Sequence, residues 1–258
     1  MSKKRVLILI PARFASSRFP GKPLAFISGV SMIERVFRNC AHAHALNFEF
    51  SAFVVTDDQR VYDHVKTFSP NVVRVDDDVL SGTLRIELAY KRFFQDKNFD
   101  LVINVQGDEP LLDSEDLVRL AHFHLDSRFD IATLVKKQMG FSGDFLDPNK
   151  VKVAMSETSG QAFYFSRASI PYKRDQIIEA LNDYWFLHIG VYSYRPNALI
   201  KFATHTETRL ENLEKLEQLR ALEIGLTIGA HTTISTVIGV DVPADIKKVE
   251  EVLNGREK

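Results

Sequence analysis

The sequence Val6-Leu7-Ile8-Leu9-Ile10 decides the fold, and Pro11-Ala12-Arg13 follows it directly. An uninterrupted apolar run of this length is typical of a β-strand that is buried on both faces. Strands of this kind occur in parallel sheets that carry helices on both sides. The stretch therefore predicts a parallel sheet in a protein of the α/β class.

Helices and strands alternate downstream of this stretch. The expected elements are a helix over Met32–Ala45, a strand over Ser51–Thr56, a helix over Gln59–Phe68, a strand over Val72–Val75, a helix over Leu84–Asp96 and a strand over Leu101–Val105. This alternation predicts a mainly parallel sheet with right-handed crossovers and flanking helices. Ligands of such sheets bind at the carboxyl ends of the strands.

The alternation weakens after about residue 130. Strand patterns at Val151–Met155, Gly160–Phe165 and Ile189–Tyr194 predict a small antiparallel β insertion at about residues 150–195. The last elements expected are a helix over Glu211–Ile224, a strand over Thr232–Val240 and a helix over Pro243–Leu253. Because no linker, low-complexity tract or repeat interrupts the sequence, we predict one α/β domain over residues 1–258 that carries this insertion.

Composition and charge exclude several classes of protein. The 258 residues are 45% hydrophobic and 26% charged, which excludes global disorder. With 33 Lys and Arg against 34 Asp and Glu, the net charge of −1 provides no overall field for nucleic acid or an anionic membrane. The apolar run after the basic N-terminus is shorter than the roughly 7–15 residues of a secretory signal or the about 20 of a membrane span. The single cysteine, Cys40, excludes an intramolecular disulfide, so we expect a cytoplasmic protein without nucleic-acid or membrane partners.

Three cations occupy the loop between the first strand and the first helix. Arg13, Arg18 and Lys22 lie within the segment Pro11–Pro23. Arg forks onto phosphate oxygens and Lys supplies a compact charge, so this loop is a candidate polyphosphate site. A solvated basic loop explains the same residues equally well. Since Lys22 precedes a proline and no Gly-x-Gly-x-x-Gly follows the strand, neither a Walker A loop nor the fingerprint of a Rossmann dehydrogenase is present.

Two carboxylates follow predicted strands. Asp108 comes after Leu101–Val105, and Asp241 comes after Thr232–Val240. Mg²⁺ prefers a few carboxylate oxygens and completes its shell with water and phosphate, so two strand-end carboxylates could share one ion. The structural alternatives are a turn at Asp108 and an N-terminal helix cap at Asp241.

The insertion and the following helix contain further polar candidates. His188 and Tyr192 are four residues apart, so in a strand both point to one face. Arg167 could bind a substrate carboxylate. Each of these residues taken alone is more often structural, and Glu217 and Gln218 carry no signal from their spacing.

Six motifs occur in order between Val6 and Val252. They are Ile10–Arg13 with Ser17–Pro23, Asn104–Pro110, Ser166–Ala168 with Ile170–Tyr172, His188–Gly190, Leu213–Arg220 and Gly239–Asp241. Together these motifs resemble the 3-deoxy-manno-octulosonate (Kdo) cytidylyltransferase family. Ser17–Pro23 and Leu213–Arg220 are nearly specific to that family.

The resemblance implies a nucleotidyltransferase that converts CTP and Kdo into CMP-Kdo and pyrophosphate with Mg²⁺, for lipopolysaccharide or capsule. It implies a Rossmann-like nucleotide-diphospho-sugar transferase fold and a homodimer formed through the β insertion. The residues that it assigns to the nucleotide are Pro11, Ala12, Arg13, Ser16, Lys22, Ser81, Gly82, Thr83, Gln106 and Asp108. Those that it assigns to the sugar acid are Gln106, Arg167, His188, Tyr192, Glu217 and Gln218. Asp108 and Asp241 would bind Mg²⁺ and, with Arg13 and Lys22, would be catalytic.

One position departs from the family pattern. The family usually has Ser-Gly-Thr-Asp/Glu-Arg where this chain has Ser81-Gly82-Thr83-Leu84-Arg85. Leu84 either packs into the core or marks a changed nucleotide or sugar preference. The alternative functions are a cytidylyltransferase for a related acidic sugar, such as 8-amino-Kdo or a nonulosonic acid, and an inactive nucleotide-binding homologue. Retention of Lys22, Asp108 and Asp241 argues against the inactive homologue.

Overall fold

The computed structural model describes residues 3–15, 18–79, 81–141, 143–174 and 183–256. The chain forms two compact units, of which the first comprises Met1–Ala121 with Ser235–Lys258 and the second comprises His122–Ile234. The insertion predicted at about residues 150–195 falls inside the second unit, which extends beyond it on both sides. Among the helices of the described residues, none combines the length and apolar character that a membrane crossing requires.

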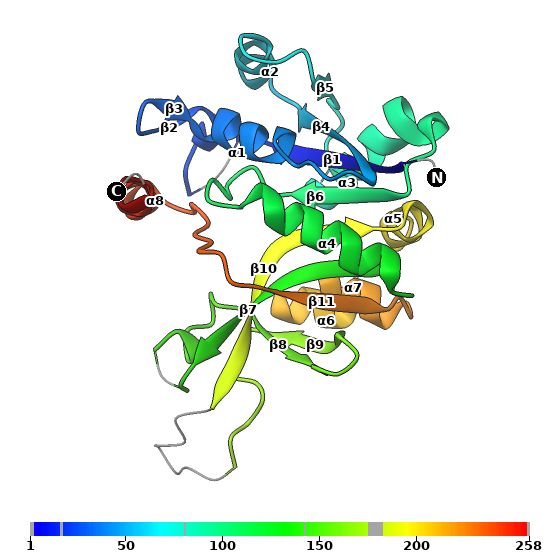
Figure 1. Cartoon of the computed structure of the whole chain (residues 1–258), viewed down its shortest axis with the longest axis vertical. Coiled ribbons are helices and arrows are strands. Elements are labelled where there is room, and N and C mark those ends of the chain that lie inside the picture. Colours follow the sequence, from blue (N-terminus) through cyan, green and yellow to red (C-terminus); the bar gives the residue numbers. More distant parts are fainter. Residues whose placement is uncertain (1–2, 16–17, 80, 142, 175–182, 257–258) are drawn as a thin grey trace. The chain divides into compact units, whose positions relative to one another are not determined.

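Four parallel strands form the sheet of the first unit (Figure 1). β1 (Lys4–Ala12) lies between β4 (Phe48–Thr56) and β6 (Leu101–Val105), and β5 (Val72–Arg74) pairs with β4. Every residue from Val6 to Ile10 is fully buried, as predicted for a strand that is covered on both faces. The predicted α/β class is therefore confirmed, and β1 and β6 carry their loops to the same edge of the sheet.

Side-chain caps fix where the helices of the first unit begin. The helices that lie wholly within this unit are α1 (Met32–Ala41), α2 (Gln59–Lys66), α3 (Gly82–Ala89) and α8 (Ala244–Arg256). Ser31, Asp58 and Ser81 each precede a helix and accept a hydrogen bond from a first-turn N–H group. Such caps satisfy donors that have no partner within the helix. The helix predicted over Leu84–Asp96 continues past α3 as a π turn (Tyr90–Phe94) and a 3₁₀ turn (Gln95–Lys97).

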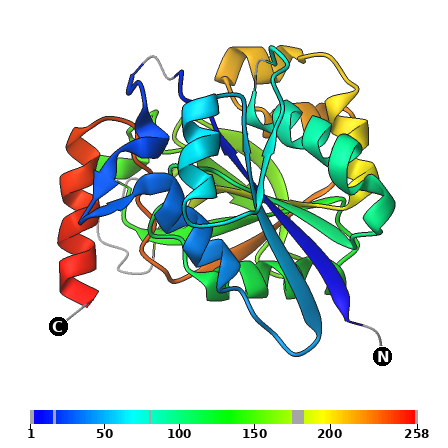
Figure 2. The same cartoon turned by 90° about the horizontal axis from the view of Figure 1, so that it is seen from above.

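The C-terminal helix packs on a small hairpin of the same unit. Figure 2 shows α8 beside β2 (Phe26–Ile27) and β3 (Val30–Ser31). Their shared apolar cluster contains the buried residues Ile27, Met32, Leu111, Val240 and Val249. Because Val240 is anchored in this cluster, the segment before α8 is held against the first unit.

Five strands and three short helices make up most of the second unit. The strands are β7 (Ile131–Met139), β8 (Lys152–Met155), β9 (Gln161–Ser166), β10 (Tyr184–Tyr194) and β11 (Ile228–Thr233), in the order β10-β7-β11-β9-β8. β11 pairs with β7 in parallel and the other pairs are antiparallel; a pairing of β8 with β10 closes the order on itself. The helices are α5 (Pro196–Ala203), α6 (Arg209–Glu214) and α7 (Gln218–Glu223).

The structure corrects two predicted elements. The strand expected over Thr232–Val240 is wrong, since β11 ends at Thr233. The apolar residues that suggested a strand instead include Ile238 and Val240, which pack in the cluster below α8. The single helix expected over Glu211–Ile224 is also wrong, because Lys215 adopts a left-handed conformation (φ 52°) and separates α6 from α7.

Three of the longer elements were not predicted, and neither were the two short strands β2 and β3. The longer ones are α4 (Ser114–Asp126), β7 and α5. The first carries Glu and Asp in its first turn, which is the usual sign of a helix start.

Candidate active site

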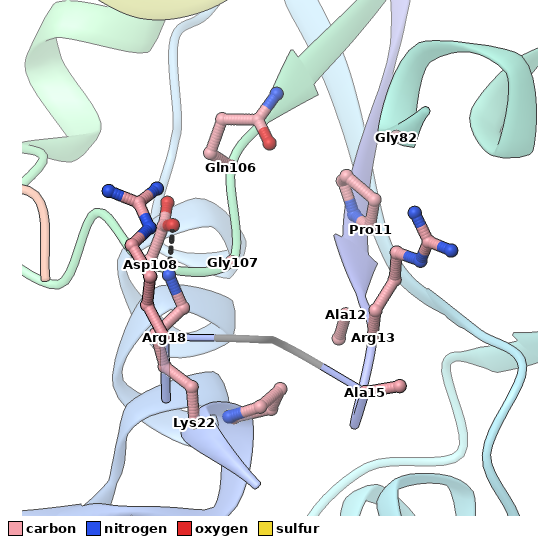
Figure 3. A pocket seen from close by; sticks show the side chains of 11 residues that line it. Pro11, Ala12, Arg13, Ala15, Arg18, Lys22, Gly82, Gln106, Gly107 and Asp108 are labelled. Atoms are coloured by element: carbon pink, nitrogen blue, oxygen red, sulfur yellow. Dashed lines mark hydrogen bonds and ion pairs between the residues drawn. The ribbon is translucent and has the colours of Figure 1, made fainter. Parts of the chain in front are cut away.

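A cavity of about 320 Å³ lies where β1 and β6 end in the first unit (Figure 3). Its lining residues are Pro11, Ala12, Arg13, Ala15, Arg18, Lys22, Pro23, Gly82, Gln106, Gly107 and Asp108. This set includes most of the residues predicted for the nucleotide. Ser81 and Thr83 flank Gly82 in the sequence, and Ser16 lies outside the described residues.

Two glycines allow three segments to meet at this cavity. A Cβ atom added to Gly107 would lie 2.7 Å from the carbonyl oxygen of Pro11, which is closer than real Cβ contacts allow. A Cβ atom on Gly82 would lie 3.3 Å from Cγ of Pro11. The ends of β1 and β6 and the start of α3 therefore approach each other at backbone distance, and position 107 has room only for glycine.

The basic loop is shaped by Gly21 so that it presents Lys22. Gly21 has a φ of 72°, a conformation that glycine adopts without steric cost, and its N–H donates to the carbonyl of Phe14 over 3.0 Å. Lys22 then begins a short 3₁₀ turn, Lys22–Leu24. Its Nζ lies 2.5 Å from Oδ2 of Asp108 and donates to the carbonyl oxygen of Val240 over 2.9 Å.

Asp241 reaches this region through a loop rather than through a strand end. The N–H of Val240 donates to the carbonyl oxygen of Asp108 over 2.9 Å, so the two carboxylate-bearing segments are joined by their backbones. The Asp241 carboxylate pairs with Arg18 at 2.9 Å. At the start of α8 it is the Asp245 side chain that accepts bonds, from the N–H groups of Asp241 and Val242. The observed contacts thus favour an ionic role for Asp241 over a helix cap.

A pair of residues that the sequence did not single out supports Arg13. The Asp57 carboxylate lies 3.9 Å from Nε of Arg13 and 2.7 Å from Nη2 of Arg85. The Arg85 side chain is only 1% exposed, and burial lowers the pKa of its guanidinium, whereas Asp57 opposes that shift. Asp57 directly follows β4, as Asp108 follows β6, so a search of strand ends could have found it.

Each cation that lines the cavity therefore pairs with a carboxylate. The pairs are Arg13 with Asp57, Arg18 with Asp241, and Lys22 with Asp108, and Arg13 shares Asp57 with Arg85. Lys22 is bonded to two other segments, so this part of the basic loop is not simply solvated.

Asp108 and Asp241 supply the hard oxygen atoms that Mg²⁺ prefers. Within the described ranges, no group of three or more His, Cys, Asp or Glu side chains is placed to hold a metal. Two carboxylates nevertheless suit Mg²⁺, which usually keeps several waters and binds substrate phosphates in addition to protein oxygens. The residues fit such an ion as a partner of a bound nucleotide.

Leu84 occupies the third position of α3. Ser81 precedes this helix, and its Oγ accepts a bond from the Leu84 N–H over 3.3 Å. A Ser followed three residues later by Glu can form a capping box, in which the acid bonds back to the N–H of the capping residue. Leu84 is partly buried, which does not separate packing in the core from a changed nucleotide or sugar preference, so both stay predictions. A leucine at this position cannot form the second bond of a capping box.

In the second unit, a bulge in β10 brings His188 and Tyr192 together. Ile189 pairs with Leu134 and Tyr192 pairs with Thr133, so two residues of β10 have no partner in the register. Residues four apart in a regular strand would be separated by about 13 Å. The ring centroids of His188 and Tyr192 are 5.3 Å apart, which confirms that they share a face and shows that the bulge shortens the distance between them.

Burial controls the protonation of both rings. It lowers the pKa of His188 to about 3, so the imidazole is neutral at neutral pH. The Thr133 hydroxyl lies 2.7 Å from the carbonyl oxygen of Val191 and 3.2 Å from Nε2 of His188. Burial, Tyr194 and Glu217 raise the pKa of Tyr192, so its phenol stays protonated and the Glu217 carboxylate lies near enough to act on it.

Arg167 and Gln218 differ in how their side chains are used. The Arg167 guanidinium donates to the carbonyl oxygens of Glu214, Pro148 and Lys215 over 2.6, 3.0 and 3.3 Å. Gln218 is 6% exposed, and its Nε2 finds no hydrogen-bond partner in the part of the chain that the structure describes. A buried amide without a partner is costly, which marks Gln218 as a candidate ligand donor. Of the predicted sugar-acid residues, Gln106 alone belongs to the first unit.

This chain is similar to known cytidylyltransferases over most of its length. Residues 7–228 match a family described as Cytidylyltransferase. The 3-deoxy-manno-octulosonate cytidylyltransferase of Myxococcus xanthus (strain DK1622) is 40% identical over 257 residues, 99% of each chain. The 8-amino-3,8-dideoxy-manno-octulosonate cytidylyltransferase of Shewanella sp. (strain W3-18-1) is 42% identical over 251 residues, 96% of this chain and 98% of that one. A solved structure of CMP:2-keto-3-deoxy-manno-octonic acid synthetase complexed with CTP has a TM-score of 0.87 and 32% identity, covering 98% of this chain and 100% of that one.

The fold and the cavity define a nucleotidyltransferase with the nucleotide-diphospho-sugar transferase fold. That class was expected from the order of the motifs. The chain belongs to the 3-deoxy-manno-octulosonate cytidylyltransferase family.

Proposed function

We propose that this chain transfers the cytidylyl group of CTP to Kdo and releases pyrophosphate, with Mg²⁺ as the metal. The observation that carries the proposal is the Lys22 contact, because one ammonium group joins the basic loop to Asp108 and to the backbone beside Asp241. These are the residues that the family motifs assign to phosphate and metal. Lys22 and Asp108 line a cavity at the edge of the sheet where such proteins bind ligands, and Asp241 pairs with Arg18 of the same cavity.

The chemistry is an in-line displacement at the α-phosphorus of CTP. The anomeric hydroxyl oxygen of the sugar forms the new bond to phosphorus, its proton leaves to solvent, and the bond to pyrophosphate breaks. Arg13 and Lys22 would hold phosphate oxygens, with Asp57 orienting Arg13. Asp108 and Asp241 would hold Mg²⁺, which when bound neutralises charge that develops on the phosphates. Positioning and charge neutralisation suffice for this reaction, and no covalent nucleophile is required.

The second unit would hold the sugar acid. A neutral His188 and a protonated Tyr192 can exchange hydrogen bonds with sugar hydroxyls without adding charge. The buried amide of Gln218 offers a donor that lacks a partner among the described residues, and Glu217 offers an acceptor beside Tyr192. This polar, charge-poor set suits a polyhydroxylated ligand.

We also propose a cytoplasmic homodimer that contacts its partner through the second unit. Large apolar side chains exposed in that unit include Met139, which is 60% exposed, and Phe163, which is 58% exposed. A dimer contact would bury such side chains. The single cysteine, Cys40, is buried and makes no disulfide, which suits a reducing compartment. Sedimentation of the wild type and of Phe163→Ser tests this assembly, and a monomeric wild type would contradict it.

Pyrophosphate release tests the activity. We expect release only when CTP, Kdo and Mg²⁺ are all present, and we expect 8-amino-Kdo and a nonulosonic acid to be poorer substrates than Kdo. Full release with EDTA, or with CTP and no sugar acid, would contradict the proposal. A preference for 8-amino-Kdo would keep the reaction and change the sugar, in line with the Shewanella relative.

A further inference from the structure

Arg167 closes a corner of the second unit with its guanidinium. Nε donates to the carbonyl oxygen of Glu214 over 2.6 Å, and Nη2 donates to that of Lys215 over 3.3 Å. Nη1 donates to the carbonyl oxygen of Pro148 over 3.0 Å. The first two carbonyls belong to the end of α6, where helix carbonyls lack partners within the helix. One side chain thus ties this helix end to the loop before β8.

These bonds occupy one of the two edges through which Arg usually binds a carboxylate. A bidentate contact uses two parallel N–H groups of the planar guanidinium. The Nε/Nη2 edge of Arg167 is already taken by Glu214 and Lys215. A sugar carboxylate would have to displace backbone carbonyls there, at the cost in free energy of the hydrogen bonds that Arg167 already makes.

Hydrogen bonds to the backbone of Arg167 fix its position. The Glu214 carboxylate accepts bonds from the Arg167 N–H over 2.8 Å and from the Ser166 hydroxyl over 2.7 Å. The fully buried Lys152 donates from Nζ to the Arg167 carbonyl oxygen over 3.0 Å. Backbone and side chain of Arg167 are therefore both fixed, as expected of a structural clamp.

The corner at Lys215, which Arg167 holds, directly precedes Glu217 and Gln218, two of the residues predicted to contact the sugar acid. Lys215 has a φ of 52°, a conformation that is uncommon for a residue with a side chain and that tertiary contacts must maintain. Two residues later comes Glu217, whose charge raises the pKa of the Tyr192 phenol, and then Gln218, whose Nε2 has no partner among the described residues. The position of both side chains depends on the direction in which the chain leaves Lys215.

We propose that Arg167 is a positioning residue that holds the corner between α6 and α7, and thereby places Glu217 and Gln218 for the sugar acid. In this role Arg167 does not bind the sugar carboxylate itself. The inference rests on the proposed function for its substrate and on the observed hydrogen bonds for its geometry.

Arg195 provides a matched control in the same unit. Its guanidinium also donates to three backbone carbonyls, those of Phe129, Ser127 and His124, over 2.9, 2.8 and 3.2 Å. None of these carbonyls belongs to the corner at Lys215. Arg167→Ala and Arg195→Ala therefore remove the same kind of clamp from two different places.

Hydrogen exchange of the substrate-free protein tests the clamp independently of activity. We expect amide exchange across residues 216–220 to be at least about tenfold faster in Arg167→Ala, and unchanged in Arg195→Ala. Arg167→Lys keeps the charge without the three-donor fork, and we expect it to behave like the alanine variant. Unchanged exchange in both Arg167 variants would overturn the proposal. If the wild type does not turn over Kdo, the proposed function fails while this measurement still tests the clamp.

Substrate analogues separate positioning from direct binding. We expect Arg167→Ala to raise the KM for Kdo by about 10–100-fold and to leave the KM for CTP within about twofold, because misplacement of about 1 Å can cost 10²-fold. We expect the ratio of the Kd values for Kdo and its carboxamide to be the same in Arg167→Ala as in the wild type. A ratio that collapses toward one in the variant would show a direct contact with the carboxylate and overturn the proposal.

Discussion

Nζ of Lys22 lies 2.5 Å from Oδ2 of Asp108 and 2.9 Å from the carbonyl oxygen of Val240. Lys22, which is predicted to bind phosphate, is thus paired with Asp108, which is predicted to bind the metal. The Val240 N–H in turn bonds to the Asp108 carbonyl, so the three segments form a closed arrangement. A substitution in any one of these segments should therefore shift the positions of the other two.

Lys22→Ala should reduce kcat by about 10²–10³-fold, because a fixed cation near the leaving phosphates would be lost. The loss of stability should be small, about 1 kcal/mol, since the pair is partly open to solvent. Pyrophosphate release and urea denaturation measure the two effects. Lys22→Met, which keeps the aliphatic stem, serves as a control for packing. A variant with a lower melting temperature and an unchanged rate constant would contradict the catalytic assignment.

Asp108→Asn and Asp241→Asn should each raise the Mg²⁺ concentration needed for half-maximal turnover by about tenfold or more, because amides are poor ligands for Mg²⁺. Magnesium titrations of pyrophosphate release measure this shift. Arg18→Ala breaks the ion pair of Asp241 without removing the carboxylate. If Asp241 serves only that ion pair, Arg18→Ala and Asp241→Asn should have the same magnesium dependence, and the metal assignment would be wrong.

Gly107→Ala should abolish CTP binding and lower the free energy of unfolding by about 1–3 kcal/mol. The new methyl group would lie 2.7 Å from the Pro11 carbonyl oxygen, so the ends of β1 and β6 would have to separate. Calorimetric titration with CTP and denaturation measure the two effects. Gly255→Ala adds the same group in α8, where nothing outside the backbone of that helix lies within 4 Å, and it should leave CTP affinity near wild type and stability unchanged or slightly raised. Normal CTP affinity in Gly107→Ala would exclude a tight approach at this position.

Leu84→Glu should be more stable than Leu84→Ala by about 0.5–1.5 kcal/mol, because it restores the acidic partner of Ser81 at the start of α3. Both variants lose the half-buried leucine, so their difference isolates the cap. Discrimination between CTP and UTP should be the same in both variants and in the wild type. A selectivity change confined to Leu84→Glu would show that the acid acts on the nucleotide instead.

Stability should fall as the pH is lowered through the window from about 6.5 to about 4. Burial lowers the pKa of His124 to about 4, and its ring bonds to the Ser193 hydroxyl and the Phe129 carbonyl. Between these pH values the unfolded chain binds a proton that the folded chain excludes, so each pH unit costs up to about 1.4 kcal/mol. Denaturation at several pH values should show a shallower dependence in His124→Gln. An equal slope in the two proteins would mean that His124 does not titrate in this window.

The parts of the fold that follow from local patterns were predictable. β1 is buried on both faces, and burial of this kind leaves an apolar run that needs no knowledge of its neighbours. The loop cations and Asp108 were found because they follow strands, and the edge of a parallel sheet collects such residues. β7 and α4 also have local patterns, which are an apolar run at the start of β7 and acidic residues in the first turn of α4.

The remaining features depend on contacts between distant parts of the chain. The residues around Lys215 have a helical pattern, but bonds from Arg167, 48 positions away, accompany a break that local propensity does not indicate. The strand expected before Asp241 was wrong because its apolar residues face a core cluster instead of a neighbouring strand. The bulge beside His188 is held by the Thr133 hydroxyl on another strand. None of these partners can be identified from a single sequence.

The pairing of the cavity cations with carboxylates has a consequence for how ligands arrive. Arg13, Arg18 and Lys22 pair with Asp57, Asp241 and Asp108, so the mouth of the cavity attracts a distant anion less strongly than three unpaired cations would. A nucleotide that carries Mg²⁺ has a smaller net negative charge than the free nucleotide. If such a complex is the ligand, its phosphates would replace the carboxylates as partners of the cations, and Asp108 and Asp241 would become available to hold the metal. Arrival by such an ion exchange would favour the metal–nucleotide complex over either component alone, and its rate would depend only weakly on salt.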